Sequence, residues 1–182
     1  MSLASTTNRN DYTGNGAASV YDYAYRIIAE TDLLVTVRDE SDPNAVEQTL
    51  LITTDYTVDG VGDDSGGSIT LVDAAQDWIS GGNLATDWHL TIRRVRPLTQ
   101  TTDIRNQGQF FPETHEDSFD HGIMIDQQLQ DGVDRSMRLP ETVDPDTVSV
   151  VLPVPVANKI IGWNADADAL ENKSSVTSTE VG

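Results

Sequence analysis

The sequence predicts a mainly β protein: a small antiparallel β-sandwich or barrel-like domain, then one long helix, then an extended β-rich segment. Three observations lead to this prediction. About six short segments of alternating polarity lie between residues 19 and 98, and turn residues separate them, as in small sandwiches. After Pro112 the hydrophobic period changes from two to that of a helix. Pro140 ends the helical pattern before a second β-like run.

The first candidate strand covers residues 20–27. Its period of two gives one apolar face, made by Tyr21, Tyr23, Tyr25 and Ile27. We expect these four side chains to be buried, and Asp22 and Arg26 to stay in water. Further strands are predicted over residues 33–38, 49–53, 56–58, 68–72 and 88–95. Residues 59–67 and the stretch that ends at Gly82 are predicted to be irregular.

The segment 112–140 is predicted to be one amphipathic helix. Thr114 and Asp117 have the spacing of a capping box, which makes Thr114 the predicted N-cap. Arg135 and Arg138 are placed in the last turn, where the helix dipole favours cations. At 100° per residue one stripe is formed by Phe119, Ile123, Asp126, Leu129, Val133 and Met137. This stripe either packs on the chain's own β domain or forms a seam between helices.

The two ends of the sequence differ from its middle in composition. Residues 1–18 are small and polar and are predicted to form an extended arm. After the helix, β-branched residues and prolines alternate in a second β-like piece over residues 148–156. The predicted organisation is an arm (1–18), a β domain (19–111), a helix (112–140), a β-rich segment (141–171) and a flexible Ser/Thr-rich tail (172–182).

The charge of the chain excludes several classes of partner. With 30 acidic and 11 basic residues among 182, the net charge is −19. Such a chain is a poor binder of nucleic acid and of anionic membrane surfaces, because both require a basic patch. No signal peptide or membrane span is predicted, so we expect a soluble product made in the cytoplasm. The acidity fits either a saline environment or a basic partner.

No catalytic, cofactor or metal site is predicted. The chain has no cysteine, which removes disulfides, thiol nucleophiles and Cys-ligated zinc. The motif Asp64-Ser65-Gly66-Gly67 is similar to the nucleophile motif of trypsin-like proteases, but the three histidines all follow it, so we predict a loop. His115 and His121 are six residues apart, too far for a helical metal pair, and are predicted to be exposed.

Three further groups have side chains that are suited to binding. Calcium could be surrounded by Asp55, Asp59, Asp63 and Asp64, but no EF-hand spacing is present. The basic cluster Arg93, Arg94 and Arg96 is predicted to pair with carboxylates inside the protein. In a standalone carbohydrate-binding sandwich the stacking residues would be Trp78, Trp88 and Trp163, although each is expected to belong to the core. We therefore predict that this chain is not an enzyme.

Several segments carry a family resemblance. They are DYTGNG (11–16), LTIRRVRPLTQ (90–100), GQFFPETHED (108–117), the stretch from QQLQ to VDRSMRLP (127–140), and VANKIIGWN (156–164). Taken in order, they resemble the amino-terminal virion-attachment domain of tail fibres and tailspikes from short-tailed phages. The resemblance covers about residues 10–140 and is most specific from Ile92 to Pro140, and the last segment resembles the start of a fibre shaft.

The resemblance implies a homotrimer on the phage tail, held between adaptor and nozzle proteins. The trimer interface would be the helix stripe Phe119, Ile123, Asp126, Leu129, Val133 and Met137. Tail-protein contacts are expected from Asn10, Asp11, Tyr12 and Asn15. The implied function is a fibre base that anchors a receptor-binding fibre, located in the virion, with the shaft starting at residues 141–171. The alternatives are the attachment part of a tailspike depolymerase and the carbohydrate-binding sandwich.

Overall fold

A computed structural model of the chain describes residues 5–72, 75–99 and 112–174. The chain divides into two units, residues 1–131 and 132–182. The described residues form antiparallel sheets and one long helix, which confirms the predicted fold class. Within these residues the sheets face each other as a sandwich and do not close into a barrel.

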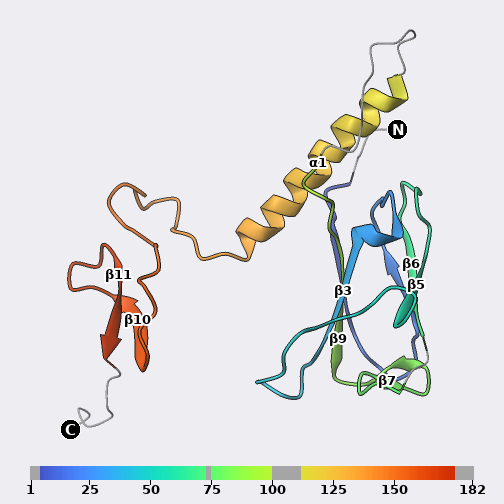
Figure 1. Cartoon of the computed structure of the whole chain (residues 1–182), viewed down its shortest axis with the longest axis horizontal. Helices are drawn as coiled ribbons and strands as arrows, with labels where there is room; N and C mark the ends of the chain where they lie inside the picture. The colour runs from blue at the N-terminus through green and yellow to red at the C-terminus, as the bar shows by residue number, and fades with distance from the viewer. Residues whose placement is uncertain (1–4, 73–74, 100–111, 175–182) are drawn as a thin grey trace. The chain divides into compact units, whose positions relative to one another are not determined.

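The larger sheet of the first unit has four strands in the order β1-β9-β3-β4. They are β1 (Arg9–Thr13), β9 (Trp88–Arg94), β3 (Leu33–Asp39) and β4 (Gln48–Thr49). The central pair, β3 and β9, runs side by side from Leu33 opposite Arg94 to Asp39 opposite Trp88 (Figure 1). Every second side chain of these strands faces the core, among them Val35 and Val37 of β3 and Leu90 and Ile92 of β9.

The second sheet has three strands in the order β2-β6-β5. They are β2 (Val20–Tyr23), β6 (Gly67–Leu71) and β5 (Tyr56–Asp59). The turn into β6 needs a glycine at position 66, which has φ +96°, and a Cβ there would lie 1.9 Å from the carbonyl oxygen of Tyr23. Only a residue without a side chain lets the loop approach β2 so closely.

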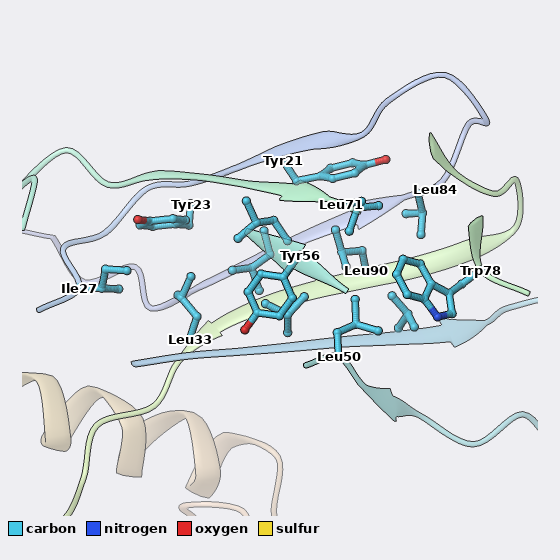
Figure 2. Packing of buried hydrophobic residues seen from close by; sticks show 14 of the residues in the cluster. Tyr21, Tyr23, Ile27, Leu33, Leu50, Tyr56, Leu71, Trp78, Leu84 and Leu90 are labelled. Atoms are coloured by element: carbon cyan, nitrogen blue, oxygen red, sulfur yellow. The ribbon is translucent and has the colours of Figure 1, made fainter. Parts of the chain in front are cut away.

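The core lies between the two sheets, and Figure 2 shows their apolar side chains pointing toward one another. All four residues of the predicted tyrosine face, Tyr21, Tyr23, Tyr25 and Ile27, are buried. The tyrosine hydroxyls keep partners: that of Tyr25 donates to the Ile92 carbonyl (2.9 Å) and that of Tyr23 to the Asp59 carbonyl (2.6 Å). Burial raises the pKa of Tyr23 to about 12. Asp22 is exposed as predicted, whereas Arg26 is largely covered.

Four segments differ from the prediction. The strand expected over residues 20–27 ends at Tyr23. The strand expected over residues 49–53 ends at Thr49, and the chain turns at residues 53–55, where Thr53 has φ 66°. An unpredicted hairpin, β7 (Ile79–Ser80) and β8 (Asn83–Leu84), turns at a pair of glycines with positive φ. Part of the expected arm, Arg9–Thr13, is strand β1 at the edge of the larger sheet.

The helix α1 covers Pro112–Asp134, and its ends differ from the expected ones. It begins at Pro112 and not after Thr114, since proline has no N–H to leave unpaired in the first turn. It stops before Pro140 because the N–H and hydroxyl of Ser136 both bond to the Val133 carbonyl (3.0 and 2.7 Å). Arg135 and Arg138 therefore follow the helix and lie outside its last turn.

The described part of the second unit contains one antiparallel hairpin, formed by β10 (Lys159–Trp163) and β11 (Leu170–Ser174). The side chain of Asn164 organises its loop, with Nδ2 donating to the Asp168 carboxylate (2.6 Å). The expected second β-like piece makes only an isolated bridge, Ser149 to Ala169. The first residues of the predicted tail, 172–174, belong to β11, and residues 175–182 lie outside the described part.

The hydroxyl of Tyr25 provides a test of the core. Tyr25→Phe removes a buried hydrogen bond without changing shape, so we expect the free energy of unfolding to fall by about 1 kcal/mol. Tyr21→Phe is the matched control, since its hydroxyl bond to Ala18 is only partly buried and should contribute less. Urea unfolding followed by circular dichroism measures both. Equal loss in the two variants would contradict this account.

Candidate interaction site

The helix α1 is held on the sandwich by arginines at the end of β9. The guanidinium of Arg93 lies 3.1 Å from the Asp131 carboxylate. Arg94 donates one hydrogen bond to the Gln127 side-chain oxygen. The backbone N–H of Arg96 donates to the side-chain oxygen of Gln128 (2.7 Å). Because positions 127, 128 and 131 share one side of a helix, these contacts hold α1 by a single face.

Arg96 joins the helix to the start of β3. Its Nη1 lies 2.5 Å from the Asp32 carboxylate, and both groups are buried. Asp32 belongs to the 3₁₀ turn η1 (Glu30–Asp32), where its carboxylate also accepts the N–H groups of Ile28 and Ala29 (both 2.9 Å). The other side of the guanidinium faces Nδ1 of His121 at 2.9 and 3.2 Å. Arginine can only donate, so Nδ1 accepts. His121 is partly buried, so the expectation that it is exposed is wrong.

Arg26 makes a second attachment of the helix. Its guanidinium lies 3.4 Å from Asp64, 3.5 Å from Asp117 and 3.6 Å from Asp120. Met124, which is 1% exposed, is buried on the same side of α1. Ion pairs of Arg26 thus hold the beginning of the helix, and the buried side chain of Met124 packs at its middle. Contacts from Arg93 and Arg94 hold the helix near its end.

The predicted internal pairing of the basic cluster is confirmed for Arg93 and Arg96. Arg94 differs, because its partners are neutral groups. Besides Gln127 it donates to the Arg26 carbonyl (2.9 Å), and it lies 5.5 Å from the ring of Tyr25. Burial lowers the pKa of Arg94. Its position depends on these neutral acceptors, and no local sequence pattern indicated them.

The amino-terminal segment meets the helix at the same place. Asn8 donates from its side chain to the Gln127 carbonyl (3.1 Å), and Gln127 donates to the Ser5 carbonyl (2.8 Å). The backbone N–H of Arg94 donates to the Asn8 carbonyl (2.9 Å). Two of the segments that carry the family resemblance, 90–100 and 127–140, therefore contact each other directly through Arg94 and Gln127.

The four residues expected to contact tail proteins lie on β1 and the turn after it, and each has a partner within the chain. Asp11 accepts from Arg9 and Thr91 (both 2.7 Å), and chiefly the bond from Arg9 lowers the pKa of Asp11 to about 2. Asn10 accepts from the Ala24 N–H (3.0 Å) and Asn15 from the Ala17 N–H (2.9 Å).

The fourth residue, Tyr12, donates its hydroxyl to the Asp22 carbonyl (2.6 Å), and its ring lies 5.0 Å from that of Tyr21. Asp11 and Asn15 are the exposed members of this set. The segment is therefore an ordered part of the sandwich surface, and the side chains of Asp11 and Asn15 are exposed to solvent.

The predicted stripe lies on the outer side of α1. Four apolar members within the helix are between 47% and 73% exposed: Phe119, Ile123, Leu129 and Val133. Asp126 is exposed among them, whereas Met137 lies beyond the end of the helix. At 100° per residue, Met124 on the docked face is about 140° away from Phe119. The described contacts of the β domain thus use the other side of the helix and leave the stripe open.

The groups weighed for chemistry have structural roles in the described residues. No cluster of three or more potential metal ligands occurs among them. Asp59 and Asp63 accept N–H groups of their own turns (2.9 and 2.8 Å), and Ser65 is exposed in that loop. Nor does α1 have the apolar length needed to cross a membrane.

The tryptophans differ in their burial. Trp78 is buried in the core as expected, and Trp88 is partly buried against it. Trp163 is exposed on β10, so the expectation that it belongs to the core is wrong. Among the described residues of its own unit, residues 132–174, no second sheet covers the hairpin that carries the ring.

Together these features describe a β-sandwich with a docked helix that exposes a row of apolar side chains on its outer face. No family model matches the chain. Over 143 residues, 79% of the chain, it is 38% identical to the tail spike protein of Salmonella phage epsilon15. The chain spans 12% of that protein's length. The predicted relation to the phage tail fibre and tailspike family is confirmed, and it supports a structural component of a phage tail.

Gln127 provides a test of helix docking. Gln127→Ala removes the side chain that joins Arg94, Ser5 and α1, and it leaves a buried guanidinium donor unpaired. We expect a loss of about 2 kcal/mol of stability, with faster amide exchange in α1 than in β3 and β9. Gln76→Ala, at an exposed glutamine, is the control and should change neither. Unchanged exchange in α1 would show that Gln127 does not hold the helix.

Proposed function

We propose that the chain is a structural virion protein, the base of a phage tail fibre, which anchors a receptor-binding fibre to the tail as a homotrimer. The observation that carries the proposal is the apolar stripe of α1, left open by the chain's own sandwich. The identity to a phage tail spike protein supports a role for this stripe in a tail protein.

The stripe has the spacing of a helix–helix seam. Ile123 lies about one turn after Phe119, Leu129 lies nearly two turns after Ile123, and Val133 lies about one turn further along α1. An exposed apolar row of this kind favours association, because burying each large side chain is worth about 1.5–3 kcal/mol. Asp126 interrupts the row with a hydrated carboxylate, and no side chain closes the seam at Gly122. We propose a seam that stays wet near these two residues.

The second unit supports the same proposal independently. Its hairpin exposes Ile160, Ile161 and Trp163, and the preceding segment exposes Val151 and Val154. A two-stranded hairpin is marginally stable by itself in water. Contact with the same residues of two other copies would cover these side chains, as at the start of a fibre shaft.

The proposed partners are the adaptor and nozzle proteins of the tail, reached through the exposed residues of β1 and of the turn after it. A net charge of −19 favours basic surfaces on those partners, because complementary charge speeds and orients association. A distal fibre or tailspike is the further proposed partner. The proposed location is the virion, and we propose no catalytic role for this chain.

A second candidate function has a specific observation in its favour. The relative is a tail spike protein, and the chain spans 12% of its length. This chain could therefore serve as the attachment part of a tailspike depolymerase whose catalytic domain lies elsewhere. A carbohydrate-binding sandwich has less support, since burial removes Trp78 as a stacking residue.

The seam is tested by Ile123→Glu combined with Leu129→Glu. The wild-type chain should have three times its 19.8 kDa mass in light scattering after size exclusion. Six added carboxylates in one trimer would repel and be poorly hydrated, so the double variant should run as a folded monomer. Leu51→Glu, at an exposed leucine outside the helix, should stay trimeric. A monomeric wild type, or a trimeric double variant, would contradict the proposed seam.

Attachment is tested by a point substitution, since deleting the amino-terminal segment would also remove β1. Asn15→Arg places a large cation on the exposed turn after β1, where contact with a basic tail protein is proposed. We expect a folded trimer that is depleted from assembled particles, measured by immunoblotting of purified virions. Thr57→Arg adds the same charge at an exposed position on β5 and should be incorporated normally. Normal incorporation of Asn15→Arg would overturn attachment through this segment.

A further inference from the structure

An open groove lies where β3 ends and β9 begins, away from the helix. Its volume is about 520 Å³, and its lining residues are Asp39, Ala45, Val46, Gln48, Asp77 and Trp88. The proposed anchoring function does not use this groove. The lining combines one aromatic ring, one aliphatic side chain that is 79% exposed (Val46) and two carboxylates, with no basic residue.

The backbone holds Trp88 firmly at the groove. Trp88 stands opposite Asp39 in the β3–β9 register, and its carbonyl accepts the N–H of Gly14 (2.7 Å). Its ring packs on the core while the residue stays partly exposed, so it also lines the groove. A ring fixed in this way offers a surface for stacking with little loss of conformational entropy on binding.

The carboxylates make the groove negative. Asp39 accepts the N–H (2.8 Å) and the hydroxyl (2.6 Å) of Ser41, and these bonds lower the pKa of Asp39, so it is ionised at neutral pH. Asp77 is exposed and also lines the groove. Two carboxylates beside an aromatic ring match a cation that can stack and donate hydrogen bonds at once.

We propose that this groove binds a basic side chain, preferably arginine, of a partner protein. The planar guanidinium would stack on Trp88 while its N–H groups donate to Asp39 and Asp77. Val46 and Gln48 would contact the neighbouring residues of the partner segment. That the partner is a tail protein rests on the proposed function, whereas binding of the basic side chain is tested independently of it. A neutral sugar could also stack on the ring, but it would leave two carboxylates without a cation.

The test measures the affinity of the full chain for a capped tetra-arginine peptide by isothermal titration calorimetry. The salt concentration is about physiological, because screening then weakens the attraction of distant charges. Asp39→Asn combined with Asp77→Asn, and separately Trp88→Leu, should each weaken binding at least about tenfold, which corresponds to 1.4 kcal/mol. The control is Asp22→Asn with Asp166→Asn, which removes the same two charges from exposed positions elsewhere. It should change affinity less than about twofold. Tetra-lysine should bind more weakly than tetra-arginine.

Three results would overturn the proposal. Equal weakening by the two aspartate pairs would show general attraction to an acidic chain, with no role for the groove. An absence of measurable tetra-arginine binding would also overturn the proposal. Binding of maltohexaose that depends on Trp88, without binding of the peptide, would identify a carbohydrate site. None of these results alters the oligomeric state or the incorporation of the Asn15 variant, so failure here is distinguishable from failure of the proposed anchoring function.

Discussion

The buried guanidinium of Arg94 is the interaction on which the arrangement of the first unit depends. It is surrounded by the ring of Tyr25, the carbonyl of Arg26 and the side chain of Gln127. The backbone N–H of the same residue donates to the carbonyl of Asn8. A buried cation without a carboxylate is tolerated only where oriented neutral acceptors replace its lost water. Core, helix and amino-terminal segment must therefore keep their places together.

This requirement also decides which side of the helix faces solvent. Because Met124, Gln127 and Asp131 face the sandwich, the apolar row that includes Phe119 and Ile123 is turned outward. The arginines at the sheet end are meanwhile occupied by internal partners. What the first unit offers to other molecules is thus an apolar helix face and a surface rich in carboxylates, which together suit the assembly role proposed for it.

The proposed helix seam must form against the net negative charge of the chain. A seam between copies brings chains of charge −19 together, so their mutual repulsion must be offset by apolar burial and by screening in salt. A basic partner would reduce the same repulsion. The groove around Trp88 shows how such a partner could be selected by chemistry as well as by net charge, since stacking and ion pairing act on one side chain.

The sequence by itself determined the features that depend on local periodicity. Periodicity is a property of neighbouring residues. The period of two predicted the burial of Tyr21, Tyr23, Tyr25 and Ile27 and the strands β3 and β9, and the helical period predicted the apolar stripe of α1. Periodicity missed the pairing of β1 with β9, the hairpin at 79–84 and the partners of Arg26 and Arg96, because these join residues far apart in the chain. Which face of α1 is docked was decided only by the tertiary structure, since both faces carry polar residues and only the fixed arginines distinguish them.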